Sequence, residues 1–194
     1  MNKDKVIIIF GFSGSGKSTI ANMVGKEYGL RIVHPSSILR SLLEKKSINI
    51  NKTKEGKGFW ETQKGMNLFK ERLKDIKPMD MVSDKILLKE LSKGNIVMDS
   101  WSMPWLYKKG IKVYLKGNPL ERAKRVSKRS KISLQEAQDA IKVKDTETRK
   151  MFKRVYGFDI KRDLEVFDLV INTTPLNQKQ VFNKVADFLN NLMK

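Results

Sequence analysis

The 194-residue chain contains no cysteine and a single histidine, His34. The absence of cysteine excludes disulfide bonds, thiolate metal sites and cysteine nucleophiles, and one histidine cannot build a multi-histidine zinc site. No apolar run approaches the roughly 18 residues that a membrane span needs, and the first residues lead straight into a strand-like run. We therefore expect a soluble, cytoplasmic protein with no membrane partner.

Acidic residues are also scarce: 21 Asp and Glu face 40 Lys and Arg, which gives a formal net charge of +19. Such an excess favours attraction to polyanions such as nucleotides or nucleic acid, although a lysine-rich genome explains it equally well. Apolar residues make up 40% of the chain and charged residues 31%, which is typical of a folded protein. The length indicates one domain, and we expect a monomer.

Short apolar runs alternate with helical patterns along the chain. This alternation predicts an α/β fold: a three-layer, five-stranded parallel sheet with helices on both faces. The expected strands are residues 6–10, 30–33, 95–98, 111–115 and 169–173, and the expected helices are residues 18–28, 36–44, 82–91, 133–156 and 181–192.

Several residues mark expected helix ends. Ser36 or Ser37 is a candidate amino-terminal cap, and Ser133 with Glu136 has the spacing of a capping box. Gly94 is expected at the position that ends the helix over 82–91. Between residues 46 and 80 the pattern is weaker, and the residues at helical spacing there are Trp60, Met66, Phe69 and Leu73.

The clearest motif follows the first strand and opens the first helix. It matches GxxxxGK[ST], the phosphate-binding loop, whose glycines let backbone N–H groups converge on phosphate oxygens at a helix amino terminus. Lys17 is expected to reach the β- and γ-phosphates, and the Ser18 hydroxyl to bind magnesium. The motif predicts ATP and Mg²⁺ as ligands, held by Gly11, Ser13, Gly14, Ser15, Gly16, Lys17, Ser18 and Thr19.

Other candidates stand at the carboxyl ends of predicted strands. Asp99 closes the apolar run 96–98, where phosphate-loop proteins place an acidic residue near the metal or the acceptor. Trp101 and Trp105 either cover a core edge or stack on a base. His34 is interpreted as a strand-end residue without a catalytic role.

Three arginines follow the fourth predicted strand at helical spacing. Arg122, Arg125 and Arg129 stand at i, i+3 and i+7, so they share one side of a helix. Either this side is a solvated surface, or its arginines close over a transferring phosphoryl group, where charge neutralisation accelerates the reaction.

Four segments together resemble the archaeal-type cytidylate kinases. They are the phosphate loop, the basic segment 122–129, the segment 149–159 with its sequence Tyr-Gly-Phe-Asp, and Phe-Asp-Leu-Val-Ile-Asn-Thr at 167–173. The resemblance covers most of the chain outside residues 46–80. It implies transfer of the ATP γ-phosphate to CMP or dCMP with magnesium.

The resemblance also implies a division of the chain and roles for further arginines. Residues 1–45, 81–120 and 157–194 would form the core, residues 46–80 a helical insert that binds the acceptor, and residues 121–156 a lid. Arg125 and Arg129 match lid arginines, Arg149 a further phosphate-contacting arginine, and Arg40 a residue that holds the acceptor phosphate.

The chain departs from the family pattern on the acceptor side. Ser36-Ser37 replaces the usual Gly-Asp pair, and Asp99-Ser100-Trp101 replaces an acidic-Gly-Arg sequence. Lys144 and Met151 stand where arginines are common. The predicted catalytic residues are Lys17, Asp99, Arg125, Arg129 and Arg149, the metal ligands Ser18 and Asp99, and the acceptor-binding residues Ser37, Arg40, Asp99 and Trp101.

Three hypotheses follow from these residues. The first is a kinase that converts ATP and CMP to ADP and CDP. The second, motivated by the +19 charge, is an RNA- or DNA-directed kinase or ATPase, or a ribonucleoprotein assembly factor, that uses the same loop. The third is a nucleotide-binding switch without transfer activity.

Overall fold

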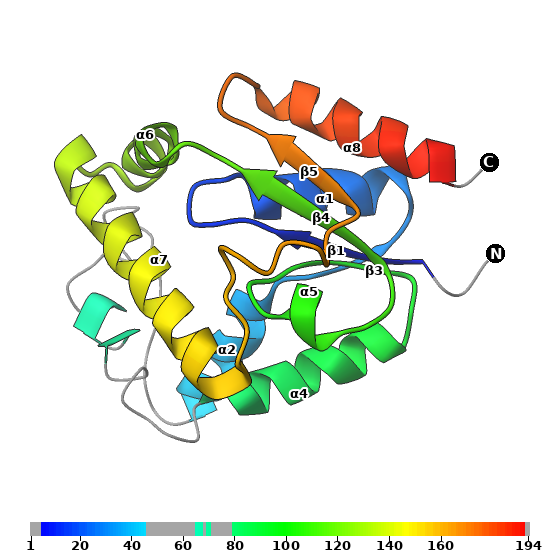
Figure 1. The fold of residues 1–194 in the computed structure, drawn as a ribbon, viewed down its shortest axis with the longest axis horizontal. Helices are drawn as coiled ribbons and strands as arrows, with labels where there is room; N and C mark the ends of the chain where they lie inside the picture. Colours follow the sequence, from blue (N-terminus) through cyan, green and yellow to red (C-terminus); the bar gives the residue numbers. More distant parts are fainter. Residues whose placement is uncertain (1–4, 46–64, 68, 71–78, 193–194) are drawn as a thin grey trace.

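The computed structural model describes residues 5–45, 65–67, 69–70 and 79–192 (Figure 1). Five strands form one sheet in the order β2-β3-β1-β4-β5, and all neighbouring strands are parallel. The predicted α/β fold with a five-stranded parallel sheet is therefore confirmed. The strands are β1 (Val6–Phe10), β2 (Arg31–Val33), β3 (Ile96–Asp99), β4 (Ile111–Lys116) and β5 (Leu169–Asn172).

Helices cover both faces of this sheet, as predicted. In Figure 1, α1 and α8 lie on one face, α4 and α5 lie on the other, and α6 and α7 stand beyond the carboxyl ends of the strands. No helix of the described residues is long and apolar enough to cross a membrane. The helices are α1 (Lys17–Glu27), α2 (Pro35–Lys45), α4 (Met79–Ser92), α5 (Met103–Leu106), α6 (Pro119–Ser130), α7 (Leu134–Tyr156) and α8 (Gln178–Leu192).

All five residues of the central strand β1 are buried. Side chains alternate across a strand, so neighbouring residues of β1 pack on opposite faces of the sheet. Ile7 and Ile9 pack in the cluster with α1 and α8, and Ile8 packs in the cluster with α4 and α5. Phe10, the last residue of β1, belongs to a third cluster that includes residues of α7. The strand that carries the phosphate loop is therefore fixed by apolar packing on both sides.

The expected helix ends are partly correct. The capping box is confirmed, because the Glu136 amide donates to Ser133 Oγ at 3.2 Å and the Ser133 amide donates to Glu136 Oε2 at 2.8 Å. Gly94 has a positive φ of 69° just after α4. The cap expected at Ser36 or Ser37 is wrong: α2 begins at Pro35, since proline needs no hydrogen-bond acceptor in the first turn. Trp60 and Leu73 lie outside the described residues.

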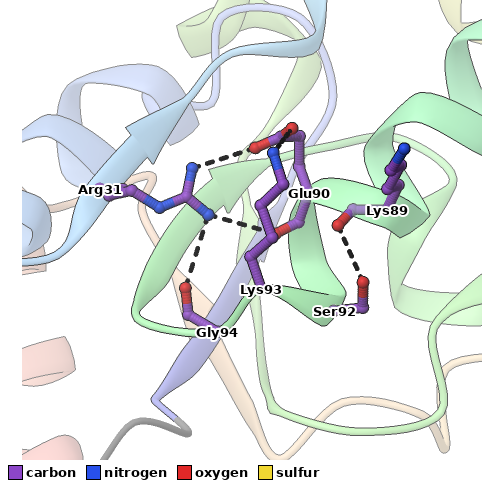
Figure 2. A network of polar contacts seen from close by, with 6 residues as sticks. All are labelled: Arg31, Lys89, Glu90, Ser92, Lys93 and Gly94. Atoms are coloured by element: carbon purple, nitrogen blue, oxygen red, sulfur yellow. Dashed lines mark hydrogen bonds and ion pairs between the residues drawn. The ribbon is translucent and has the colours of Figure 1, made fainter.

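An ion-pair network fastens edge strand β2 to the end of α4 (Figure 2). Arg31 donates to Glu90 Oε2 at 3.0 Å and to the Glu90 carbonyl at 3.2 Å, and Lys93 Nζ lies 2.5 Å from Glu90 Oε1. Hydrogen bonds from Lys93 and Arg31 hold the pKa of Glu90 below its usual value. The arginine thus satisfies a carbonyl at the carboxyl end of the helix, where positive charge is favourable.

Candidate functional site

The phosphate loop is built mainly from backbone. Gly14 and Gly16 have φ values of 79° and 93°, a region that side chains strongly disfavour, and Gly16 caps α1 without a side-chain hydrogen bond. A Cβ on Gly11 would lie 2.2 Å from Ser15 Oγ, so this position also excludes a side chain. The result is a glycine-rich loop that leads directly into a helix amino terminus, the arrangement that binds phosphate.

Lys17 is the first residue of α1 and sits among charges of both signs. Burial lowers its pKa; Arg129 and Lys144 lower it further, and Asp99 and Asp145 oppose that shift. Its ammonium group lies 5.4 Å from the centre of the Trp101 ring, within range of a cation–π contact. Burial thus disfavours the charged form of this lysine, and a bound polyphosphate would stabilise that form.

Asp99 joins the phosphate loop to the neighbouring strands. Ser18 Oγ donates to Asp99 Oδ2 at 2.5 Å, and His34 Nδ1 lies 2.5 Å from Asp99 Oδ1. Asn22 Oδ1, on α1, lies 3.1 Å from the other ring nitrogen of His34. The hydrogen bond with Asp99 raises the pKa of His34, while burial opposes the rise. Both oxygens of this buried carboxylate thus have a fixed partner.

His34 is a site residue that the sequence interpretation missed. The information that identifies His34 is the strand pairing, in which Val33 of β2 lies beside Met98 of β3. The next residue of each strand, His34 and Asp99, therefore comes to the same edge of the sheet. Strand order cannot be obtained from the local pattern around His34. The residues around His34 alone therefore indicate only a strand end, whereas the structure places its ring against the predicted metal ligand Asp99.

The three spaced arginines of α6 do not act as one group. Arg122 is buried; it donates to the Ser13 carbonyl at 3.0 Å and to Asp145 Oδ2 at 2.7 Å. Arg125 donates to the carbonyl and the hydroxyl of Thr173 at 2.6 and 3.2 Å. Arg129 lines the cavity beside the phosphate loop. The structure thus places one of the three arginines at that cavity.

Asp145, on α7, connects the phosphate loop to this helix through Arg122. Burial raises the pKa of Asp145, and Arg122 opposes the rise. A Cβ on Gly14 would lie 2.4 Å from the Arg122 carbonyl, so the loop and α6 are in close backbone contact. Arg122 therefore fixes the phosphate loop by its hydrogen bond to the Ser13 carbonyl. The position of Arg122 among basic residues did not indicate this role.

Arg149 lies farther along α7 and is paired with a carboxylate. Its Nε and Nη2 donate to the two oxygens of Asp159 at 2.7 and 2.6 Å. These hydrogen bonds hold the pKa of Asp159 at about 2. Arg149 does not line the cavity in this structure, and its predicted phosphate contact stays a prediction.

One cavity of about 310 Å³ joins the phosphate loop to residues of α2, α4, β3, α6 and α7. Of the predicted residues, it brings together Ser13, Gly14, Lys17, Ser18, Asp99, Trp101 and Arg129. Ser37 is exposed and outside its lining, whereas its neighbour Ser36 belongs to the lining; the side chain of Arg40 lies outside what the structure describes. The sequence had not assigned a role to Leu39, Phe69, Ser83, Asp84, Leu87, Ser102, Thr148 or Phe152, which also line the cavity.

The two tryptophans after β3 have different surroundings. Trp105 is buried, stacks on Phe158 with ring centres 4.9 Å apart, and donates from Nε1 to the Asp163 carbonyl at 2.7 Å. Trp101 is half-buried and faces the cavity. Trp105 therefore covers a core edge, and Trp101 is available to a ligand.

The fold and this cavity define the class of the protein: a P-loop kinase, with the loop between the central strand and α1 and helices beyond the carboxyl ends of the strands. Solved structures of shikimate kinases share this fold. The enzyme from Bacteroides thetaiotaomicron has a TM-score of 0.57 at 14% identity, over 97% of this chain and 98% of its own. The enzyme from Acinetobacter baumannii has a TM-score of 0.54 at 19% identity, over 98% and 96%.

Sequence comparison narrows this class. Residues 6–175 match the cytidylate kinase-like family. A cytidylate kinase from Ignicoccus hospitalis is 32% identical over 95% of this chain and 98% of its own length. Cytidylate kinases from Pyrococcus horikoshii and Methanocaldococcus jannaschii are each 30% identical, over 99% and 97% of this chain and 92% and 99% of their own. The chain belongs to the cytidylate kinase-like family, a group of nucleoside monophosphate kinase-like phosphotransferases.

Proposed function

We propose that this protein transfers the γ-phosphate of ATP to CMP or dCMP, in the presence of Mg²⁺. The observation that carries the proposal is the shared cavity: Lys17 and Gly14 of the phosphate loop line the same space as residues of α2, α4 and the loop after β3. A donor phosphate on the loop would therefore meet an acceptor without intervening protein. Family membership and the similar cytidylate kinases support cytidylate as that acceptor.

The cationic side chains provide the main catalytic contribution in this proposal. Lys17, Arg129 and Lys144 line the cavity, and the charges of Arg129 and Lys144 lower the pKa of Lys17, which supports placing all three near one bound phosphate group. Negative charge on the transferring phosphoryl group is stabilised by such preorganised cations. The acceptor phosphate is already anionic, so no general base is needed. Arg125 remains a predicted lid arginine and Arg149 a predicted phosphate-contacting arginine, and to reach a phosphate they would have to leave Thr173 and Asp159 respectively.

The donor set beside the loop suits magnesium. Ser18 and Asp99 place a hydroxyl and a carboxylate oxygen 2.5 Å apart at the carboxyl end of β3, and Mg²⁺ prefers such hard oxygen ligands. When bound there with the nucleotide, the ion would neutralise charge on the β- and γ-phosphates. His34 holds the other oxygen of Asp99 and so orients the carboxylate.

ADP formation from Mg²⁺ and ATP with each nucleoside monophosphate in turn tests the proposal. We expect rapid turnover with CMP or dCMP and none when EDTA removes the metal. The same assay with a short RNA at low and moderate salt tests the nucleic-acid hypothesis, which the comparisons do not favour. If no monophosphate stimulates ADP formation but RNA does, the proposal is contradicted. A cytoplasmic location and a monomeric state remain predictions of the sequence.

A further inference from the structure

The side chain of Lys17 rests on the indole ring of Trp101. Its ammonium group lies over the ring, 5.4 Å from the ring centre, and the negative face of an aromatic ring attracts a cation at this distance. Lysine carries its charge on a flexible four-carbon stem, so the direction of the charge depends on what the ammonium contacts. The aromatic contact therefore restrains the lysine that is expected to reach the ATP phosphates.

Trp101 is itself held by the segment that carries Lys17. Phe12, in the phosphate loop, packs edge-on against the indole with ring centres 5.4 Å apart, and the ring of Phe10, at the end of β1, lies 6.3 Å away at 85°. Perpendicular ring pairs at these distances are favourable. Trp101 also lines the cavity. The indole thus has a fixed orientation between the phosphate loop and the cavity.

Two carboxylates compete with Trp101 for the ammonium, since the charges of Asp99 and Asp145 both act on Lys17. The oxygens of Asp99 already have fixed partners, whereas Asp145 Oδ1 is buried and has no hydrogen-bond partner among the described residues. A buried oxygen without a partner is costly, so an ion pair with Lys17 would be favourable there. A nucleotide would then have to break that pair before Lys17 could reach its phosphates.

We infer that Trp101 is a positioning residue for Lys17: its indole face holds the ammonium at the cavity and out of an ion pair with Asp145, ready for the phosphates of ATP. A ring face attracts a cation less strongly than a carboxylate does, so a phosphate can draw the lysine away at small cost. The inference rests on the proposed function for the identity of the nucleotide as ATP. It gives Trp101 a role toward the phosphate donor, beside the acceptor-binding role predicted from the sequence.

The primary experiment weakens the attraction of the ring face with little change in the shape of the ring. Tryptophan analogues with increasing numbers of fluorine atoms on the benzene ring are introduced at position 101 alone, by nonsense suppression in the full chain, because each fluorine withdraws electron density from the ring face. ATP binding with Mg²⁺ and without an acceptor is measured by titration calorimetry. We expect the Kd for ATP to rise with each fluorine, to about tenfold for the tetrafluoro ring. A Kd that stays constant or falls across the series would overturn the inference.

Trp105 is the matched control for fluorination itself. It stacks on Phe158 and donates to the Asp163 carbonyl, and the same analogues keep both its ring and its N–H. Fluorination at Trp105 should leave the Kd for ATP close to that of wild type. If the analogues at Trp105 raise the Kd as much as those at Trp101, the effect comes from altered aromatic packing and the inference fails.

Trp101→Phe and Trp101→Leu extend the test to ordinary variants. Phenylalanine offers a smaller ring face and leucine offers none, so ATP affinity should fall more in Trp101→Leu than in Trp101→Phe. Equal losses in the two variants would contradict a contact with the ring face.

Failure of the proposed function has a separate signature. It appears as absent ADP formation with every monophosphate, while the Kd for ATP still rises across the fluorinated series. A protein that phosphorylates CMP and binds ATP equally well with every analogue at position 101 keeps the proposed function and refutes the role of Trp101.

Discussion

The two halves of the cavity are built from different parts of the chain. The half that we propose binds ATP is built mainly from backbone: Gly14 and Gly16 have positive φ values, and the loop leads into the start of α1. The half that we propose binds the acceptor is built from side chains, including Asp84 held by Ser102 and the aromatic ring of Trp101. Backbone recognises a phosphate, which every nucleotide carries, whereas side chains distinguish one acceptor from another.

This difference explains where the chain departs from its family pattern. A backbone-built site needs glycine at a few positions, and here the whole motif is present. A side-chain-built site changes its preference with single substitutions. The departures at Ser36, Ser37 and Trp101 fall where the family resemblance implies the acceptor, and Ser36 and Trp101 line the cavity. The donor half should therefore be intolerant of substitution at its glycines and lysine, and the acceptor half should respond by changing specificity.

Lys17→Ala should have the largest effect, because in the proposed function Lys17 supplies positive charge to the transferring phosphate. We expect kcat to fall about 100-fold or more, with little loss of melting temperature. Lys26→Ala is the matched control, since Lys26 is an exposed lysine of the same helix. Near-wild-type turnover by Lys17→Ala would show that the loop does not carry the reaction.

Gly14→Ala tests the backbone half directly. Its φ of 79° costs an alanine about 1–2 kcal/mol, and the added Cβ would lie 2.4 Å from the Arg122 carbonyl. We expect a drop in melting temperature together with weaker ATP binding. Gly29→Ala separates the two causes, because Gly29 has a φ of 62° and open space around its Cβ. If both variants lose equal stability, the contact with Arg122 has no role.

His34→Ala should have an intermediate effect. Loss of a hydrogen bond to a charged group would release one oxygen of Asp99, and we expect kcat/KM to fall about tenfold with an increased requirement for Mg²⁺. His34→Asn can still donate a hydrogen bond to the carboxylate and should recover part of the loss. A Mg²⁺ requirement that is identical in all three proteins would refute a positioning role for His34.

The Arg149–Asp159 pair should produce the smallest effect at neutral pH. The pKa of Asp159 is held at about 2, below its ordinary value of 3.8, so the pair stabilises the fold fully above about pH 4 and less as the pH falls toward 2. Asp159→Asn should lower the melting temperature by a few degrees at pH 7, and the difference from wild type should narrow below pH 4. A difference independent of pH would exclude this ionic contribution.

Much of the fold could be predicted from local patterns. Each of the five strands is a short apolar run, and the capping box at Ser133 lies within four residues, so neighbours in sequence decide both. The start of α2 could not be predicted from its serines, because Pro35 suits the first turn without a side-chain cap.

The candidate site was predictable only where one contiguous segment builds it. The phosphate loop is such a segment. Asp84, His34 and Arg122 act through partners 18 to 109 residues away, and those pairings depend on strand order and helix packing. Arginine spacing on α6 correctly suggested a common side of the helix, but burial and local acceptors at Ser13 and Thr173 direct the side chains to different places.

The position of Trp101 makes it an intrinsic fluorescence probe of the phosphate loop. Its indole ring lies 5.4 Å from the Lys17 ammonium and packs edge-on against Phe12 with ring centres 5.4 Å apart. Indole emission responds to nearby charge and solvent, so a nucleotide that draws Lys17 toward its phosphates will change the fluorescence of Trp101. Nucleotide occupancy of the loop can therefore be followed in real time, without a label, by a signal that Trp101→Phe removes.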